Sequence, residues 1–216
     1  METNKIHPSK IISAGVAPEH AKKALIMLHG RGGTAEDILS LSSFLNVEDF
    51  ALLAPQARDN TWYPYSFLAP VFQNEPFLSS ALERVKETMD EIISKGIPKE
   101  HIYLLGFSQG ACLALEFAAR NAGRFGGVIA FTGGLIGEKI DRSHYAGDFK
   151  KTPVFVGSSN PDPHVPAERV DQSAAVLKSM NAEVSVKMYH GMGHTISENE
   201  MELANKLIFK SGRSEI

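Results

Sequence analysis

A serine lies between two glycines in the segment Gly106-Phe107-Ser108-Gln109-Gly110. The apolar run 101–105 precedes this segment and the helix-forming stretch 111–119 follows it, which places the serine on a strand-to-helix turn. Glycine tolerates the crowding on both sides of such a turn and lets the backbone lift the hydroxyl of Ser108 clear of the sheet edge. We therefore predict that Ser108 is a nucleophile.

A serine nucleophile needs a base to take its proton and an acid to orient that base. In α/β hydrolases the acid and the histidine follow the serine in chain order, each on a loop after a later strand. Asp162 follows the apolar run 153–156, and His194 follows the last run, which ends near Tyr189. We predict that Asp162 is the acid and His194 the base.

His190 is the alternative base, because it lies at the predicted strand end. His194 lies past two glycines, at the predicted start of the last helix, where a flexible loop can bring it over Ser108, so we give His190 a supporting or structural role. The two histidines are four residues apart, as in a metal-binding helix motif. The Gly-Met-Gly between them neither favours a helix nor supplies a glutamate, so we expect no metal site.

The attacked carbonyl becomes an oxyanion, which needs N–H donors that are already in place. The backbone N–H of Gln109, the residue after the nucleophile, is one expected donor, because it lies at the positive end of the helix. The second should come from the glycine-rich loop 28–33, and we predict the backbone N–H of Arg31. For the Arg31 side chain, an ion pair or solvent contact is favoured over substrate binding.

A long loop, residues 55–76, carries four prolines among several aromatic residues. Its aromatic side chains could line a substrate pocket or pack the loop onto the body, and the sequence favours neither. Our candidate substrate-binding residues are His29, Gly30, Trp62, Tyr63, Phe72 and Met192. His29 is also expected to brace the glycine-rich loop.

The order of the predicted elements indicates the fold class. The continuous apolar runs 24–28, 50–54, 102–105, 127–131 and 153–156 are typical of strands buried on both faces. A sixth run, 184–188, alternates, and helical spacing appears at 78–92, 112–119, 170–180 and 201–209. We therefore predict a mostly parallel, doubly wound α/β sheet flanked by helices.

The composition of the chain indicates its domain number and argues against nucleic-acid binding and membrane insertion. The chain has 216 residues, 43% of them hydrophobic, which suits a single domain over 1–216. Its 22 Lys and Arg against 25 Asp and Glu give a net charge of -3, so nucleic acid is not an expected partner. Without an apolar run of membrane-spanning length, and with the single cysteine Cys112, we expect a soluble, cytoplasmic protein without stable membrane insertion.

The chain resembles the phospholipase/carboxylesterase family of α/β hydrolases, which includes bacterial carboxylesterases and acyl-protein thioesterases. Four segments carry the resemblance: the glycine loop from Leu28, the 106–110 turn, Asp162-x-x-Val165-Pro166, and 191–194. It implies an α/β-hydrolase fold without a large lid domain, a triad of Ser108, Asp162 and His194, and oxyanion donors at Arg31 and Gln109. It also implies hydrolysis of carboxylic or thioester bonds without a cofactor, and frequent homodimers.

Two segments depart from that family's pattern. Members commonly carry Gly-Leu-Gly-Asp where this chain has the residues 30–33, Gly-Arg-Gly-Gly, and often a His-Gly pair where it has 158–161. The difference at 158–161 leaves the placement of Asp162 in force, because the residues after it still match. The charged Arg31, where an apolar residue often lies, and the aromatic loop favour short or aromatic acyl esters over lipids. We expect a serine carboxylesterase acting on small esters through an acyl-enzyme. The alternatives are a lysophospholipase or acyl-protein thioesterase, and a non-catalytic ligand-binding protein on a hydrolase scaffold.

Overall fold

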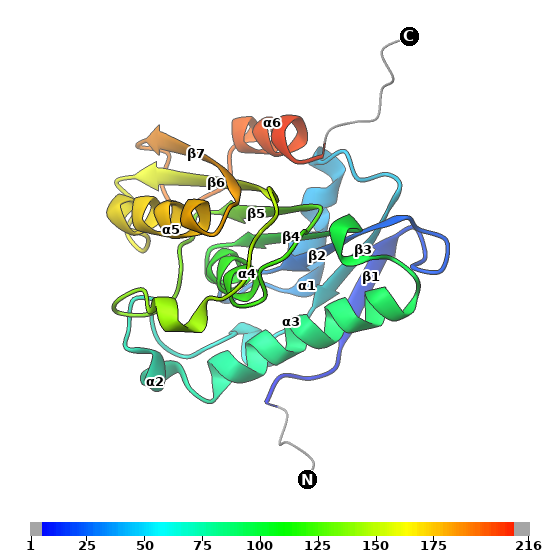
Figure 1. Cartoon of the computed structure of the whole chain (residues 1–216), viewed down its shortest axis with the longest axis horizontal. Helices are drawn as coiled ribbons and strands as arrows, with labels where there is room; N and C mark the ends of the chain where they lie inside the picture. The colour runs from blue at the N-terminus through cyan, green and yellow to red at the C-terminus, as the bar shows by residue number, and fades with distance from the viewer. Residues whose placement is uncertain (1–5, 210–216) are drawn as a thin grey trace.

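A computed structural model describes residues 6–209, whose centre is a seven-stranded sheet in the order β1-β3-β2-β4-β5-β6-β7 (Figure 1). All neighbouring strands are parallel except β1, which pairs antiparallel with β3 at one edge. The strands are β1 (Ile11–Gly15), β2 (Lys23–Leu28), β3 (Phe50–Pro55), β4 (Ile102–Phe107), β5 (Gly127–Phe131), β6 (Pro153–Asn160) and β7 (Glu183–His190).

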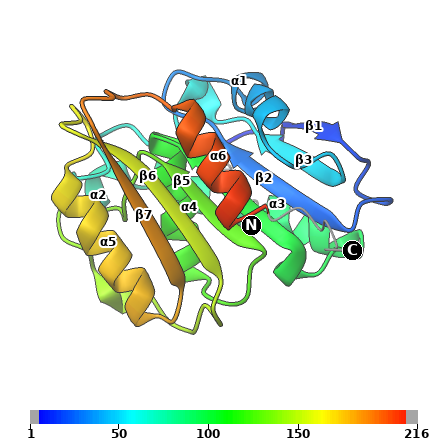
Figure 2. The same ribbon diagram turned by 90° about the horizontal axis from the view of Figure 1, so that it is seen from above.

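Helices cover both faces of this sheet. Helices α1 and α6 lie over one face (Figure 2), whereas α3, α4 and α5 pack on the other. The helices are α1 (Ala35–Ser40), α2 (Val71–Asn74), α3 (Phe77–Ser94), α4 (Gln109–Arg120), α5 (Ala167–Ser179) and α6 (Glu198–Leu207). The arrangement is the α/β-hydrolase fold that the sequence predicts.

Alternation along each central strand divides the core in two. In β2, Ala24, Ile26 and Leu28 belong to the cluster under α3, α4 and α5. Leu25 and Met27 point the other way, into the cluster under α1 and α6. All five side chains are inaccessible to solvent. A strand buried on both faces therefore reads as an uninterrupted apolar run, which is why the central strands were predictable.

The six strand predictions and the four helix predictions are confirmed, with small changes at their ends. The edge strand β1 was missed, because its sequence Ile-Ile-Ser-Ala-Gly is short and largely exposed and so carries no apolar pattern. The six-residue α1 was missed as well, since it is too short for helical periodicity. Neither omission affects the site, because the parallel strands place their carboxyl ends at a common edge.

The loop 55–76 contains short helical segments, and most of its aromatic side chains are buried. It contains a 3-10 turn, Arg58–Asn60, and the short helix α2. Trp62, Tyr63 and Phe67 are 0%, 1% and 7% exposed, so most of its aromatic bulk packs the loop onto the body. The packing interpretation therefore accounts for Trp62, whereas Tyr63 and Phe67 both pack the loop and line the cavity described below.

Candidate active site

Ser108 lies on a strained turn between β4 and α4. Its φ of 53° is unusual for a residue with a side chain, and its N–H donates to Phe131 O at 2.9 Å. The flanking glycines are required by contact: a Cβ at Gly106 would lie 2.2 Å from Gly110 O, and one at Gly110 would lie 2.1 Å from Leu28 O. The turn therefore holds the hydroxyl at the sheet edge, as the sequence predicted.

Ser108, His194 and Asp162 form one chain of hydrogen bonds. His194 Nε2 lies 2.8 Å from Ser108 Oγ, and His194 Nδ1 lies 2.9 Å from Asp162 Oδ2 and 3.2 Å from Oδ1. With a proton on Nδ1, the ring donates to the carboxylate and leaves Nε2 free to accept from the serine hydroxyl. The three predicted residues are thus brought together from the loops after β4, β6 and β7.

Asp162 is held as a carboxylate, although its side chain is fully buried. Burial opposes ionisation, but Oδ1 accepts the backbone N–H groups of His164 and Val165, each at 2.8 Å, and the carboxylate accepts from His194. Together these donors outweigh desolvation and hold the pKa of Asp162 below its ordinary value. An ionised carboxylate can fix the histidine tautomer and stabilise an imidazolium.

The loop after β7 carries His194 over the serine. His194 lies before α6 rather than at its start, because that helix begins only at Glu198. The positive φ of Gly193 allows the turn, and its N–H donates to Ser159 Oγ at 3.1 Å, which joins this loop to the end of β6. His190 is exposed at the end of β7 and is outside the hydrogen-bonded chain.

The imidazole of His194 packs between two rings. Its centroid lies 5.4 Å from that of Phe107 and 4.9 Å from that of His164, which meets it edge-on at 83°. Only 20% of the His194 side chain is exposed. The ring therefore has little freedom to leave the position in which Nε2 faces the serine. The contact with His164 was not predicted, because nothing in the sequence indicates which way that side chain turns.

The glycine-rich loop after β2 is braced by His29, which is 1% exposed. His29 Nε2 accepts the backbone N–H of Ala57 at 3.1 Å, so the ring proton is on Nδ1, which donates to Gly30 O at 2.8 Å. Trp62 Nε1 donates to His29 O at 2.9 Å, and Gly33 N donates to Gly30 O to close the turn. His29 thus shapes the loop and does not reach the substrate side.

The two residues predicted as oxyanion donors have backbone N–H groups without a backbone acceptor in the described part of the chain, and their side chains share an acceptor. Arg31 N and Gln109 N have no backbone acceptor among the turn and loop bonds of residues 6–209, and Gln109 is the first residue of α4. Their side chains meet at one atom: Tyr63 O accepts from Gln109 Nε2 at 2.8 Å and from Arg31 Nη2 at 2.9 Å. Gln109 Oε1 also accepts Trp62 N at 2.9 Å.

A cavity of about 810 Å³ opens beside Ser108. Tyr63 and Arg31 line it, together with the triad residues Ser108 and His194. The other residues around it, most of which sequence reasoning missed, are Pro64, Tyr65, Ser66, Phe67, Leu68, Gln109, Cys112, Pro163, His164 and Val165.

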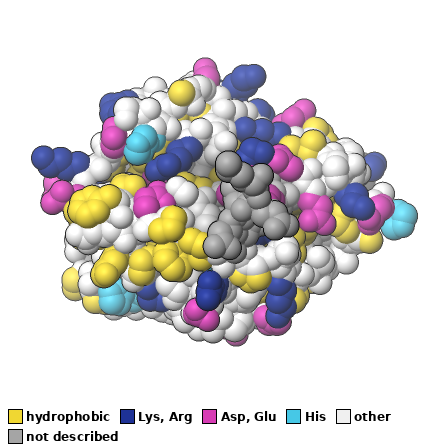
Figure 3. All heavy atoms as spheres, turned by 90° about the horizontal axis from the view of Figure 1, so that it is seen from below, with side chains coloured by type: hydrophobic (Ala, Val, Ile, Leu, Met, Phe, Trp, Pro, Cys, Tyr) yellow, Lys and Arg dark blue, Asp and Glu magenta, His cyan; other side chains and the backbone are white. Residues whose placement is uncertain are grey.

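Of the six predicted substrate-binding residues, Tyr63 lines this cavity, and the other five, His29 among them, do not. Trp62 is completely buried, and its indole N–H donates to His29 O rather than facing the cavity. Phe72 projects from α2 with 75% of its surface exposed. Figure 3 shows one face of the molecule, on which hydrophobic side chains gather among charged ones. Met192 is half-buried in the histidine loop. Gly30 is buried against the nucleophile: a Cβ there would lie 3.5 Å from that of Ser108.

Cys112 lines the floor of the cavity one helical turn after the nucleophile. It is 1% exposed, and burial raises the pKa of its thiol to about 12. A thiol that stays protonated at neutral pH is a weak nucleophile, so Cys112 contributes shape rather than reactivity.

No three His, Cys, Asp or Glu side chains within residues 6–209 are grouped so as to hold a metal ion. No helix in the same range has the length and apolar character to cross a membrane.

Comparison with known proteins identifies the family. A model of the phospholipase/carboxylesterase family matches residues 9–211 of this chain. The chain belongs to the phospholipase/carboxylesterase family. It is accordingly a serine hydrolase of the esterase class, as predicted from the sequence.

Named members of this family resemble the chain over most of its length. A crystal structure of a phospholipase/carboxylesterase from Dyadobacter fermentans is 56% identical, with a TM-score of 0.94 over 94% of this chain and 98% of that one. Acyl-protein thioesterase 1 of Saccharomyces cerevisiae is 29% identical, over 93% of this chain and 96% of its own length. A probable carboxylesterase of Arabidopsis thaliana, SOBER1-like, is 26% identical over 84% of this chain and 76% of its own length.

The buried His29 predicts a pH-dependent stability. Burial is the main reason that its pKa is lowered from the ordinary value of 6.5. Since the unfolded chain binds the proton more readily, His29 stabilises the fold above about pH 6.5, and this contribution is lost as the pH falls through the folded pKa. We expect the thermal midpoint to fall less between about pH 7 and about pH 5 in His29→Gln, which keeps an acceptor for Ala57 N but does not titrate.

Differential scanning fluorimetry across that range checks this expectation. Other groups titrate in both proteins and cancel in the comparison, so equal falls in the wild type and in His29→Gln would contradict it.

Proposed function

We propose that this protein is a serine carboxylesterase that hydrolyses small carboxylic esters through an acyl-enzyme. The observation that carries the proposal is the continuous hydrogen-bonded chain from Ser108 Oγ through His194 to the Asp162 carboxylate, with distances of 2.8 and 2.9 Å. In a triad of this geometry, the histidine takes the serine proton during attack on a carbonyl carbon, and the aspartate stabilises the imidazolium that forms.

The proposed reaction has two halves. Ser108 Oγ attacks the carbonyl carbon while His194 Nε2 takes its proton, and the N–H groups of Arg31 and Gln109 meet the developing oxyanion. The tetrahedral intermediate collapses, and the alcohol leaves with the proton from His194. Water then attacks the acyl-enzyme, with His194 again as the base, and the acid and free Ser108 are released.

The size and the lining of the cavity favour a small ester as the substrate. Its walls combine the aromatic loop residues Tyr63, Tyr65 and Phe67 with the aliphatic Leu68 and Val165, and its volume of about 810 Å³ lies within the range for small-molecule sites. An acyl-protein thioesterase is the second candidate. It is favoured by the similarity to the yeast acyl-protein thioesterase 1 over almost the whole of both chains. The same triad chemistry serves ester and thioester.

Product partitioning tests the proposal with the wild-type protein. 4-Nitrophenyl butyrate and phenyl butyrate should both be hydrolysed, and in the presence of methanol both should give the same ratio of methyl butyrate to butyrate. The ratio is shared because both substrates pass through one butyryl-enzyme, so unequal ratios would exclude the acyl-enzyme. Absence of turnover would instead favour a ligand-binding role on this scaffold. Matched butyryl thioesters, run alongside, would distinguish the second candidate.

A further inference from the structure

The cavity beside Ser108 carries a fixed positive charge and no acidic side chain. Arg31 is the charged residue in its lining, and neither aspartate nor glutamate is among the described residues that line it. The nearest carboxylate, Asp162, is fully buried and occupied by His194 and two backbone N–H groups. The wall therefore presents a charge that no carboxylate of the lining offsets.

Arg31 uses only part of its guanidinium within the protein. Nη1 donates to Pro64 O at 3.0 Å, and Nη2 donates to Tyr63 O and Tyr65 O at 2.9 and 2.8 Å. A guanidinium has five N–H groups, so two remain, one on Nε and one on Nη1. Neither has an acceptor among residues 6–209, and Arg31 is exposed. The three carbonyls fix the plane of the group without neutralising it.

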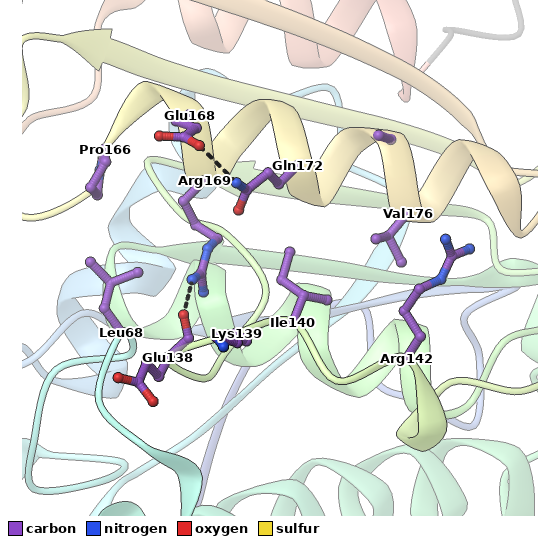
Figure 4. A pocket seen from close by; sticks show the side chains of 11 residues that line it. Leu68, Glu138, Lys139, Ile140, Arg142, Pro166, Glu168, Arg169, Gln172 and Val176 are labelled. Atoms are coloured by element: carbon purple, nitrogen blue, oxygen red, sulfur yellow. Dashed lines mark hydrogen bonds between the residues drawn. The ribbon is translucent and has the colours of Figure 1, made fainter.

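A second cation lies behind the same loop. Arg169 reaches from α5 to the backbone of Glu138, beside Leu68 (Figure 4), and it also donates to the carbonyls of Leu135 and Gly137. Its side chain is 93% buried, its Nε has no partner, and its guanidinium carbon lies 6.0 Å from the centre of the Phe67 ring. Two arginines bound mainly to carbonyls thus contact the stretch 63–68, Arg31 through the carbonyls of 63–65 and Arg169 through the ring of Phe67.

A neighbouring cavity of about 580 Å³ shares Leu68 with the first. Its lining contains two acids, Glu138 and Glu168, and three bases, Lys139, Arg142 and Arg169 (Figure 4). Each lining thus has one positive charge in excess, but among the described residues the Ser108 cavity is the one whose base has no acid beside it in the lining.

We propose that the enzyme prefers ester substrates that carry an anionic group, such as a carboxylate, which binds a free N–H group of the Arg31 guanidinium. The proposal rests on the proposed esterase function and names its substrate class. Both hydrogens of Nη2 are used, so the two free N–H groups lie on different edges of the guanidinium, and a carboxylate accepts one charge-assisted hydrogen bond from either of them. It meets no repelling acid among the described residues that line the cavity. The anion belongs either to the acyl chain or to the leaving alcohol, and both arrangements place it in the same cavity.

Two pairs of matched substrates separate these arrangements. Mono-4-nitrophenyl adipate against 4-nitrophenyl hexanoate tests an anion on the acyl chain, and 4-acetoxybenzoate against 4-acetoxybenzamide tests one on the leaving group. In at least one pair, the ratio of kcat/KM for the anionic ester to that for the neutral ester should fall roughly tenfold in Arg31→Gln, mostly through KM. Added salt should lower the same ratio in the wild type.

Two further variants separate recognition of the substrate's charge from the hydrogen bonds by which Arg31 holds the loop residues 63–65. Arg31→Lys keeps the charge but lacks the planar guanidinium that binds the carbonyls of residues 63–65. It should therefore recover part of the anionic preference while turnover of the anionic and the neutral ester of each pair falls. Arg124→Gln is the matched control, since Arg124 is an exposed arginine that also binds backbone carbonyls. It lies just before β5, at the amino ends of the parallel strands, whereas Ser108 lies at their carboxyl ends. This control should leave the ratio unchanged.

The inference is overturned if Arg31→Gln lowers both members of each pair equally, or if Arg124→Gln shifts the ratio as much. Calorimetric binding of mono-4-nitrophenyl adipate and of 4-acetoxybenzoate to Ser108→Ala needs no turnover, and the affinity for at least one of them should weaken roughly tenfold when Arg31→Gln is added. Unchanged affinities for both would overturn the inference even if no ester is hydrolysed. Turnover of neutral esters without any anionic preference would remove this inference and leave the esterase function standing.

Discussion

Replacing Ser108 with alanine should lower kcat for 4-nitrophenyl butyrate by about 10⁶-fold, because the hydroxyl that we propose as the nucleophile, hydrogen-bonded to His194, is removed. A fluorophosphonate probe should add one adduct to the wild-type protein and none to Ser108→Ala, as measured by intact mass spectrometry. The fold should survive, since the hydroxyl makes one hydrogen bond, to His194, and the turn is held by backbone contacts.

Equal labelling of the wild type and Ser108→Ala would show that another residue is the nucleophile. Cys112 is the neighbouring candidate, and Cys112→Ala is therefore the matched control, which should retain full labelling because the buried thiol stays protonated.

Replacing His194 with alanine should reduce turnover by about 10⁵- to 10⁶-fold, because it removes the nitrogen that lies 2.8 Å from Ser108 Oγ and that we propose as the base. The matched control is His190→Ala, which alters the exposed histidine at the end of β7 and should retain most of the activity. Steady-state kinetics with the same ester measure both, and the thermal midpoint of each variant checks its fold.

The opposite result, loss of activity in His190→Ala with His194→Ala still active, would transfer the role of base to His190. Because His194 is four residues away on the same loop, a merely structural effect of the loop would reduce both variants alike. The comparison therefore distinguishes chemistry from loop disorder.

The arrangement of Ser108, Asp162 and His194 was predictable because each follows a predicted strand. Ser108 and Asp162 follow continuous apolar runs, and His194 follows the alternating run 184–188. Once the sheet is parallel, Ser108, Asp162 and His194 must emerge at one edge, and chain order assigns them. Gly106 and Gly110 were predictable for a similar reason, since their close contacts are a local property of the turn.

The walls of the cavity were not predictable from such patterns. Trp62 was expected to face the substrate, but its N–H groups are bound by His29 and Gln109, which lie far away in sequence. The side chain of Arg31 was expected to meet solvent or an acid, and it instead binds carbonyls more than thirty residues further along. Contacts of this kind depend on the assembled fold. Oligomeric state and cellular location stay predictions.

The carbonyl of Tyr63 links the speed of this enzyme to its selectivity. It receives the side chains of both residues whose backbone N–H groups we propose for the oxyanion, and it begins the stretch 63–68 that walls the cavity. Grafting a new loop here to admit a different acyl group would therefore also move the two donors. Protein engineers should see rate and preference change together, and libraries that keep the backbone of Tyr63 while varying Leu68 offer the way to separate them.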